Sequence, residues 1–108
     1  MTTPMEAAGN GLEHHALAVA LVSSSTDGCV ATVRGELDMA TGETLREFLQ
    51  TVSGDVRLDC SGLTFLDASG LRVLLAASAR LRELRLVNLR PAQRRILELT
   101  HTTSLLGD

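Results

Sequence analysis

The residues of this chain that could do chemistry are three histidines, two cysteines and one serine that follows an aspartate. His14 and His15 precede the first apolar run, and His101 follows the last helical pattern with no cysteine or carboxylate positioned beside it. Cys29 and Cys60 lie in apolar surroundings without C-x-x-C spacing or a nearby histidine, so neither a zinc site nor a redox pair is indicated. We therefore predict no metal and no cofactor, and we expect both thiols to be buried.

The serine lies in the sequence Asp67-Ala68-Ser69-Gly70-Leu71, where a loop leads into an apolar helical pattern. Serine is a preferred N-cap residue, which gives Ser69 a purely structural interpretation. The functional interpretation is an exposed hydroxyl at a helix N-terminus, where free amide N–H groups and the positive end of the dipole tolerate an added phosphate. Gly70, which lacks a side chain, would let the backbone of another protein or a nucleotide approach closely.

Catalysis by Ser69 is poorly supported, and we predict that the chain is not an enzyme. A nucleophile elbow requires a glycine two residues before the serine, where this chain has Asp67, and the sequence shows no base for the hydroxyl. Glycine-rich phosphate cradles of the G-x-G-x-x-G and G-x-x-x-x-G-K types are also missing, and all ten basic residues are arginine. No catalytic residue is therefore assigned.

Composition and charge exclude further classes of partner. Only 2% of the residues are aromatic, which argues against a stacking platform for nucleic-acid bases. Residues 1–68 hold three arginines and ten acidic residues, whereas residues 69–108 hold seven arginines and three acidic residues, and this basic half is too sparse for a nucleic-acid stripe. No run of about 18 apolar residues could span a bilayer, and no basic leader precedes the first apolar run. We expect a cytoplasmic protein without nucleic-acid or membrane contacts.

The elements that must position Ser69 follow from hydrophobic spacing. Two short apolar runs, 16–22 and 29–33, predict strands joined by a hairpin at Asp27-Gly28. Apolar residues at i, i+3, i+4 and i+7 from Leu45 predict the first helix, and alternation over 56–60 predicts a third strand followed by a loop over 61–67. A buried helix over 71–79, a strand over 84–87 and a helix that opens at Pro91 and runs to residue 99 complete the pattern.

This ββαβαβα order predicts a single α/β domain with a mixed four-stranded sheet, formed by an N-terminal hairpin and crossover βα units and covered by helices. We expect residues 1–14 to be a disordered N-terminal lead and residues 15–106 to form the domain. The terminal Leu105-Leu106 pair is expected to dock onto the core.

Three segments of the chain form a set in this order. They are G-E-L-D at 35–38 followed by Thr41 and Leu45, L-D-C-S-G-L-T-F-L-D-A-S-G-L at 58–71, and P-A-Q-R-R-I-L at 91–97. The set resembles the STAS domain of the anti-sigma factor antagonist family, over roughly residues 15–106. In that family the unphosphorylated protein binds an ATP-dependent anti-sigma serine kinase and frees its sigma factor. Phosphorylation of the serine in a D-S-S-G turn breaks the complex, and a phosphatase restores it.

The resemblance implies that Ser69 is the phosphorylated residue and that Asp67 is the acid of its turn. Ala68 replaces the first serine of D-S-S-G, so Ser69 is the only acceptor in the turn. Asp38 matches a loop acid that lies near the partner in relatives. The alternative that we keep open is a STAS-like accessory domain that is never phosphorylated and binds a nucleotide, a lipid or a transport ATPase. The residues expected to contact the partner are Asp38, Thr41, Asp67, Ala68, Gly70 and Arg72.

Overall fold

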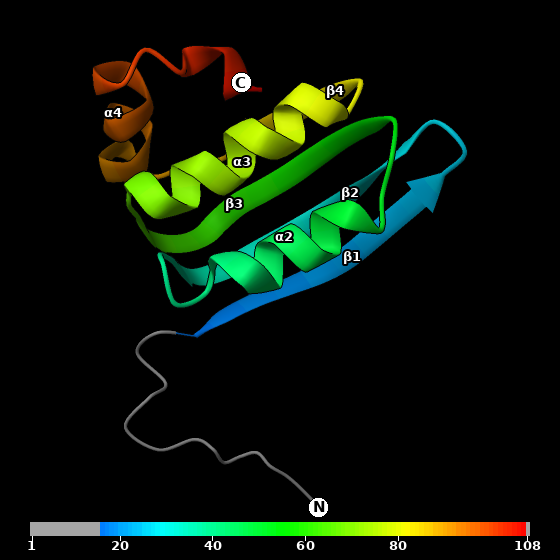
Figure 1. Cartoon of the computed structure of the whole chain (residues 1–108), viewed down its shortest axis with the longest axis horizontal. Coiled ribbons are helices and arrows are strands. Elements are labelled where there is room, and N and C mark those ends of the chain that lie inside the picture. Colours follow the sequence, from blue (N-terminus) through cyan, green and yellow to red (C-terminus); the bar gives the residue numbers. More distant parts are fainter. Residues whose placement is uncertain (1–15, 108) are drawn as a thin grey trace, which may run out of the picture.

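The computed structural model describes residues 16–107, and the predicted N-terminal lead lies outside the described residues. Within residues 16–107 the chain forms a four-stranded sheet and three α-helices in the predicted ββαβαβα order (Figure 1). The elements are β1 (Leu17–Ser25), β2 (Gly28–Leu37), α2 (Gly42–Gln50), β3 (Asp55–Leu66), α3 (Ala68–Arg80), β4 (Glu83–Val87), α4 (Pro91–Leu99) and a 3-10 turn, η2 (Thr103–Leu105).

The sheet is mixed, as predicted, and its strands follow one another in the order β1-β2-β3-β4. β1 and β2 form an antiparallel hairpin whose tip pairs Ser25 with Gly28, while β2, β3 and β4 run parallel. The parallel pairs need crossover connections, which α2 and α3 supply. Because β2 and β3 end in register at Leu37 and Leu66, the turns that lead into α2 and α3 lie side by side at one end of the sheet.

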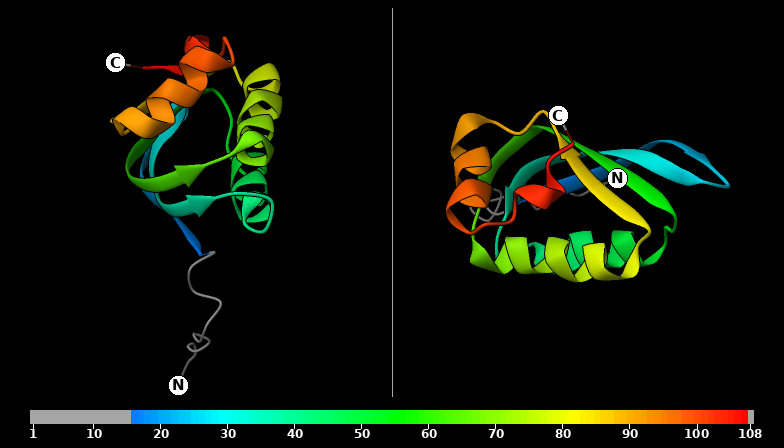
Figure 2. Two further views of the ribbon diagram at one scale, coloured as in Figure 1. Left: turned by 90° about the vertical axis from the view of Figure 1, so that its left-hand side faces the viewer. Right: turned by 90° about the horizontal axis from the view of Figure 1, so that it is seen from above.

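The core lies between the sheet and the two crossover helices. Side chains at alternating positions of β2 and β3 are buried and face α2 and α3, which lie together on one side of the sheet in both views of Figure 2. α4 lies on the other side, near one end, and leaves much of that face uncovered. Twelve side chains are almost completely buried, namely Leu37, Leu45, Leu49, Leu58, Leu63, Leu66, Leu74, Leu86, Leu97, Leu105, Val33 and Val56.

The predicted loop over 61–67 was wrong, because β3 continues to Leu66. Its buried side chains change from a spacing of two to a spacing of three at Cys60, Leu63 and Leu66, so the alternation that marks a strand is lost. The cause is a pair of register shifts against β2, one between Thr32 and Arg34 and one at Gly35. Gly35 has φ +108°, where a Cβ would lie 2.3 Å from the carbonyl oxygen of Ala16, so this position requires glycine.

The C-terminus docks onto the core as expected. Leu105 is 1% exposed, Leu106 forms a parallel bridge with Leu86, and the Gly107 N–H donates to the Leu86 carbonyl at 2.8 Å. Both cysteines are buried and form no disulfide with a described residue, and burial raises the pKa of the Cys29 thiol. None of the helices within residues 16–107 is long and apolar enough to cross a membrane.

Candidate functional site

Asp67 ends the connection from β3 and begins α3. Its carboxylate Oδ1 accepts a hydrogen bond from the Gly70 N–H at 3.0 Å, and its backbone carbonyl accepts from the Leu71 N–H at 2.9 Å. Asp67 has extended backbone angles, so it is the N-cap residue of the helix. The interpretation of Ser69 as the N-cap was therefore wrong, because Asp67 already performs this function two residues earlier.

Ser69 is the second residue of α3 and is partly exposed. Its hydroxyl makes no hydrogen bond to any described residue, and the neighbouring Ala68 is exposed. Amide N–H groups at the first positions of a helix have no partner within the helix. The structure therefore presents a serine hydroxyl, without a structural task, at the start of a well-capped helix.

Gly70 makes its close contacts inside the protein, and its predicted role in the approach of another molecule stays a prediction. It is buried, and a Cβ on it would lie 2.6 Å from Leu37 Cγ, 2.7 Å from the Leu37 carbonyl oxygen and 3.0 Å from Leu66 Cδ1. Its missing side chain lets the first turn of α3 pack against the ends of β2 and β3. The packing of Gly70 therefore fixes the position of the adjacent Ser69 at the start of the helix.

Asp38 and Thr41 organise the neighbouring turn between β2 and α2. Asp38 Oδ1 accepts from the N–H groups of Ala40 at 2.9 Å and Thr41 at 3.1 Å. The Thr41 hydroxyl donates to the Glu36 carbonyl at 2.6 Å and accepts from the Asp38 N–H at 3.0 Å. Asp38 is 8% exposed and Thr41 is 5% exposed, so both side chains hold the turn together from within.

The two turns and the helices that follow them border an open hollow of about 430 Å³. It brings together three of the predicted residues, Asp38, Ser69 and Arg72, from two elements far apart in the sequence. Asp67, Ala68, Gly70 and Thr41 do not line it. Sequence reasoning missed the other lining residues, which are Met39, Gly42, Glu43, Arg46, Val73 and Ala76.

The missed residues add apolar side chains and an ion pair to the lining of the hollow. Met39 is 81% exposed beside Asp38, and Val73 follows Ser69 by one helical turn. Arg46 forms an ion pair with Glu43, which lowers the pKa of the Glu43 carboxyl. A methionine directly after the G-E-L-D segment was the only sequence signal for this side of the site.

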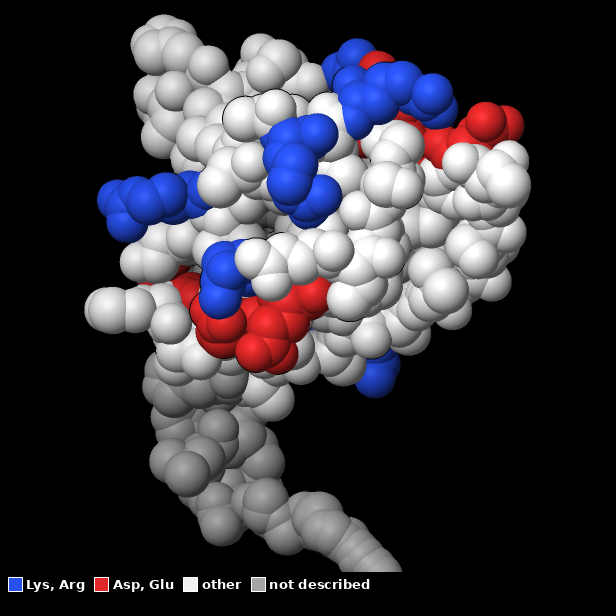
Figure 3. All heavy atoms as spheres, turned by 45° about the vertical axis from the view of Figure 1, so that its right-hand side comes forward, with Lys and Arg blue, Asp and Glu red and all other residues white. Residues whose placement is uncertain are grey.

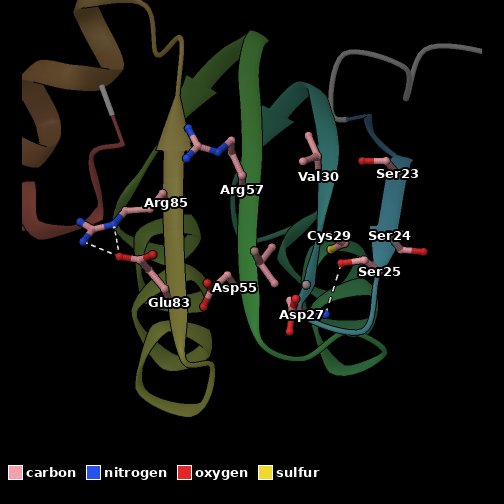
Figure 4. Close-up of a pocket in the computed structure, with 12 residues that line it drawn as sticks. Ser23, Ser24, Ser25, Asp27, Cys29, Val30, Asp55, Arg57, Glu83 and Arg85 are labelled. Carbon is pink, nitrogen blue, oxygen red and sulfur yellow. Dashed lines mark hydrogen bonds and ion pairs between the residues drawn. The ribbon is translucent and has the colours of Figure 1, made fainter.

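A second hollow, of about 510 Å³, lies on the sheet face that the helices leave open (Figure 4). It contains none of the predicted site residues. Arg57 and Arg85 are opposite each other on β3 and β4, and Arg85 is bonded to Glu83 at 2.7 Å. No group of side chains that could hold a metal ion occurs in the part of the chain that the structure describes.

Charge does not concentrate into one patch on the face shown in Figure 3, where blue and red side chains form small separate groups. Several of these charges pair with each other, as Arg82 does with Asp55 at 2.7 Å, and this arginine lowers the pKa of the Asp55 carboxyl. Most of the basic half of the sequence is thus a solvated, partly paired surface. The hollow beside Ser69 remains the candidate site.

The chain is similar to proteins of a known family and fold. A family model described as "Mlab, STAS domain" matches residues 20–107. An anti-sigma factor antagonist from Mycobacterium paratuberculosis has a similar structure, with a TM-score of 0.75 at 26% identity over 86% of this chain and 85% of that one. No protein in the curated set matches the sequence.

Two further structures share the fold. The anti-sigma factor antagonist SpoIIAA in its unphosphorylated form has a TM-score of 0.68 at 20% identity, over 84% of this chain and 87% of that one. The Bacillus cell fate determinant SpoIIAA in its phosphorylated form has a TM-score of 0.62 at 22% identity, over 84% of this chain and 90% of that one. With the family model covering most of its length, the chain belongs to the STAS domain family.

Proposed function

We propose that this protein is an anti-sigma factor antagonist whose binding to an anti-sigma serine kinase is switched by phosphorylation of Ser69. The observation that carries the proposal is the partly exposed, unbonded hydroxyl of Ser69 beside the hollow. Similarity to the mycobacterial antagonist supports the role, and the resemblance of the Asp67-Ala68-Ser69-Gly70 turn to D-S-S-G supports the residue.

The kinase would use Ser69 as the nucleophile toward ATP. The Oγ–phosphorus bond forms while the bond between the γ-phosphorus and its bridging oxygen breaks, ADP leaves, and a base of the kinase takes the hydroxyl proton. A phosphatase reverses the state when water attacks phosphorus, which restores the hydroxyl and releases inorganic phosphate. The chain itself contributes only the presented hydroxyl.

The phosphate would weaken binding by charge and by size. It adds about −1.5 to −2 charges at neutral pH. Asp38 and Glu43 contribute two negative charges to the lining of the hollow, and Arg46 and Arg72 contribute two positive charges, so a phosphate on Ser69 makes a neutral surface negative. Repulsion between the phosphate and one negative charge of the kinase about 6 Å away, at an effective dielectric near 20, is about 3 kcal/mol before screening. Halved for exposure, it still changes an affinity roughly tenfold.

Phosphorylation tests the residue. The full chain is incubated with ATP and a panel of purified anti-sigma serine kinases, and its intact mass is measured. We expect one added phosphate on the wild type and none on Ser69→Ala. Ser53→Ala, which removes an exposed hydroxyl far from the site, is the matched control and should behave like the wild type. Equal phosphorylation of the wild type and Ser69→Ala would refute the assignment.

Binding tests the switch. Ser69→Ala should bind the kinase as tightly as the unphosphorylated wild type does, and Ser69→Asp should bind it about tenfold more weakly, measured by calorimetry. Equal affinities of the two variants would reject the mechanism. A chain that no kinase phosphorylates or binds would favour the accessory domain that takes a nucleotide, a lipid or a transport ATPase.

A further inference from the structure

Arg72 lies where a phosphate on Ser69 would be within its reach. It follows Ser69 by three residues on α3, and both residues line the hollow. Residues at i and i+3 of a helix are neighbours, with about 5–6 Å between their Cβ atoms. The guanidinium of an exposed arginine can span a further distance of this size, because its side chain is long and rotates freely.

Arg72 has no partner among the described residues, unlike the other arginines on α2 and α3. Arg46 pairs with Glu43, and Arg80 donates to the Leu49 carbonyl. Arg72 forms no hydrogen bond or ion pair with a described residue, although acidic side chains line the same hollow. An unpaired guanidinium can therefore accept an anion without breaking an existing bond.

The acidic groups around the hollow are already engaged. Asp38 accepts from the N–H groups of the β2–α2 turn, Asp67 accepts from the Gly70 N–H, and Glu43 is paired with Arg46. None of these hydrogen bonds or ion pairs involves Arg72. When Ser69 gains a phosphate, Arg72 is the charged group on its own helix face with no competing partner.

We propose that Arg72 binds the phosphate of phospho-Ser69 through charge-assisted hydrogen bonds within α3, and so leaves the surface that a partner would contact. Arginine matches phosphate with two parallel N–H donors, which favours this pairing over a simple charge contact. The phosphate then acts twice, since it adds negative charge and withdraws a basic side chain from the docking surface. The physiological use of this contact rests on the proposed function.

The test needs no partner protein. Phosphoserine is incorporated at position 69 during translation, and the second ionisation of the phosphate is followed by phosphorus NMR against pH. An adjacent guanidinium favours the dianion, so Arg72 lowers the pKa of the phosphate. We expect Arg72→Gln to raise that pKa by about 0.5 unit and Arg72→Lys to raise it by about half as much.

The matched control is Arg95→Gln, because Arg95 is an exposed arginine on α4 with no hydrogen bond or ion pair to a described residue. It should leave the pKa of the phosphate within about 0.1 unit of the wild type. An equal shift in the two variants would mean that only net charge matters and would overturn the proposal. An unchanged pKa in Arg72→Gln would overturn it as well.

A second measurement uses the unaltered arginine. The Nε–H signal of Arg72 in the wild type should shift when Ser69 is replaced by phosphoserine, while that of Arg95 should not. Absence of this shift would contradict the contact even if a variant failed to fold. Because phosphoserine is incorporated directly, failure of the kinases to phosphorylate Ser69 would refute the proposed function but would not affect this measurement.

Discussion

The two strand-to-helix turns at one end of the sheet use the same chemistry for different purposes. Each begins with an aspartate whose Oδ1 accepts amide N–H groups of the following turn, Asp38 before α2 and Asp67 before α3. The first aspartate is buried and the second is partly exposed. Adjacent parallel strands bring the two turns side by side, so one can support the other.

The two turns differ in the position of their hydroxyl group. In the first turn the Thr41 hydroxyl is buried and bonded to the Glu36 carbonyl, which fixes the loop. In the second turn the Ser69 hydroxyl points to no described partner and lies at the hollow. A buried hydroxyl that is bonded adds rigidity, whereas a free one can be modified without cost to the fold. We therefore call the β2–α2 turn with Asp38 and Thr41 the frame, because it stabilises the structure, and the β3–α3 turn with Asp67 and Ser69 the site.

The largest expected effect concerns the glycines of the two turns. Gly70→Ala should destabilise the chain by about 2–3 kcal/mol, because its Cβ meets the Leu37 backbone and cannot be accommodated by a side-chain rotation. Gly42→Ala meets only Val73 Cγ2 at 3.2 Å, and alanine is the better helix former by about 1 kcal/mol, so its net change should be small. Urea unfolding measures both, and equal losses would mean that the two turns are packed alike.

The two capping aspartates give the next effect. Asp38→Ala leaves two amide N–H groups without their acceptor in a buried turn and should cost about 2 kcal/mol of unfolding free energy. Asp67→Ala removes one cap bond at a partly exposed helix start and should cost about 1 kcal/mol. Asp38→Asn keeps an oxygen acceptor and is the matched control. A larger loss for Asp67→Ala would reverse the assignment of frame and site.

The sequence predicted the element order and the mixed sheet because both follow from local spacing and crossover rules. It also singled out Asp38, Ser69 and Arg72, three residues that the structure places around one hollow. Their roles as partner contacts stay predictions.

What the sequence could not predict depends on long-range packing. The end of β3 was missed because two register shifts in its pairing with β2, one between Thr32 and Arg34 and one at Gly35, break the strand period. The packing role of Gly70 was missed because its contacts come from Leu37 and Leu66, more than thirty residues away in one case. Met39 and Val73 carry no motif, and only the packing of two helices places them at the hollow.

A third aspartate, Asp59, makes the same kind of contact, in which a carboxylate accepts a backbone N–H, and its effect on stability can be tested by changing the pH. Asp59 Oδ1 accepts from the Ser61 N–H at 3.0 Å and from the Asn88 amide, and these bonds lower the pKa of its carboxyl. Because the folded pKa lies below the unfolded value, the stabilisation is present above about pH 4 and is lost as the pH falls through the folded pKa. Asp59→Asn should therefore be less stable than the wild type near neutral pH, and the difference should shrink in acid. A difference that is constant with pH would show that the charge of Asp59 contributes nothing.

The smallest expected change in the free energy of unfolding comes from substitutions of Ser69, and it can be compared with the change caused by substituting Thr41. Ser69→Ala should change the unfolding free energy by less than about 0.5 kcal/mol, because its hydroxyl has no bond to lose. Ser69→Asp should be as stable or gain a few tenths of a kcal/mol from the helix dipole. Thr41→Val, in contrast, removes a buried hydroxyl that bonds Glu36 and should cost about 1–2 kcal/mol. If Ser69→Ala were as costly as Thr41→Val in urea unfolding, Ser69 would belong to the frame, and its modification would unfold the turn instead of marking an intact surface.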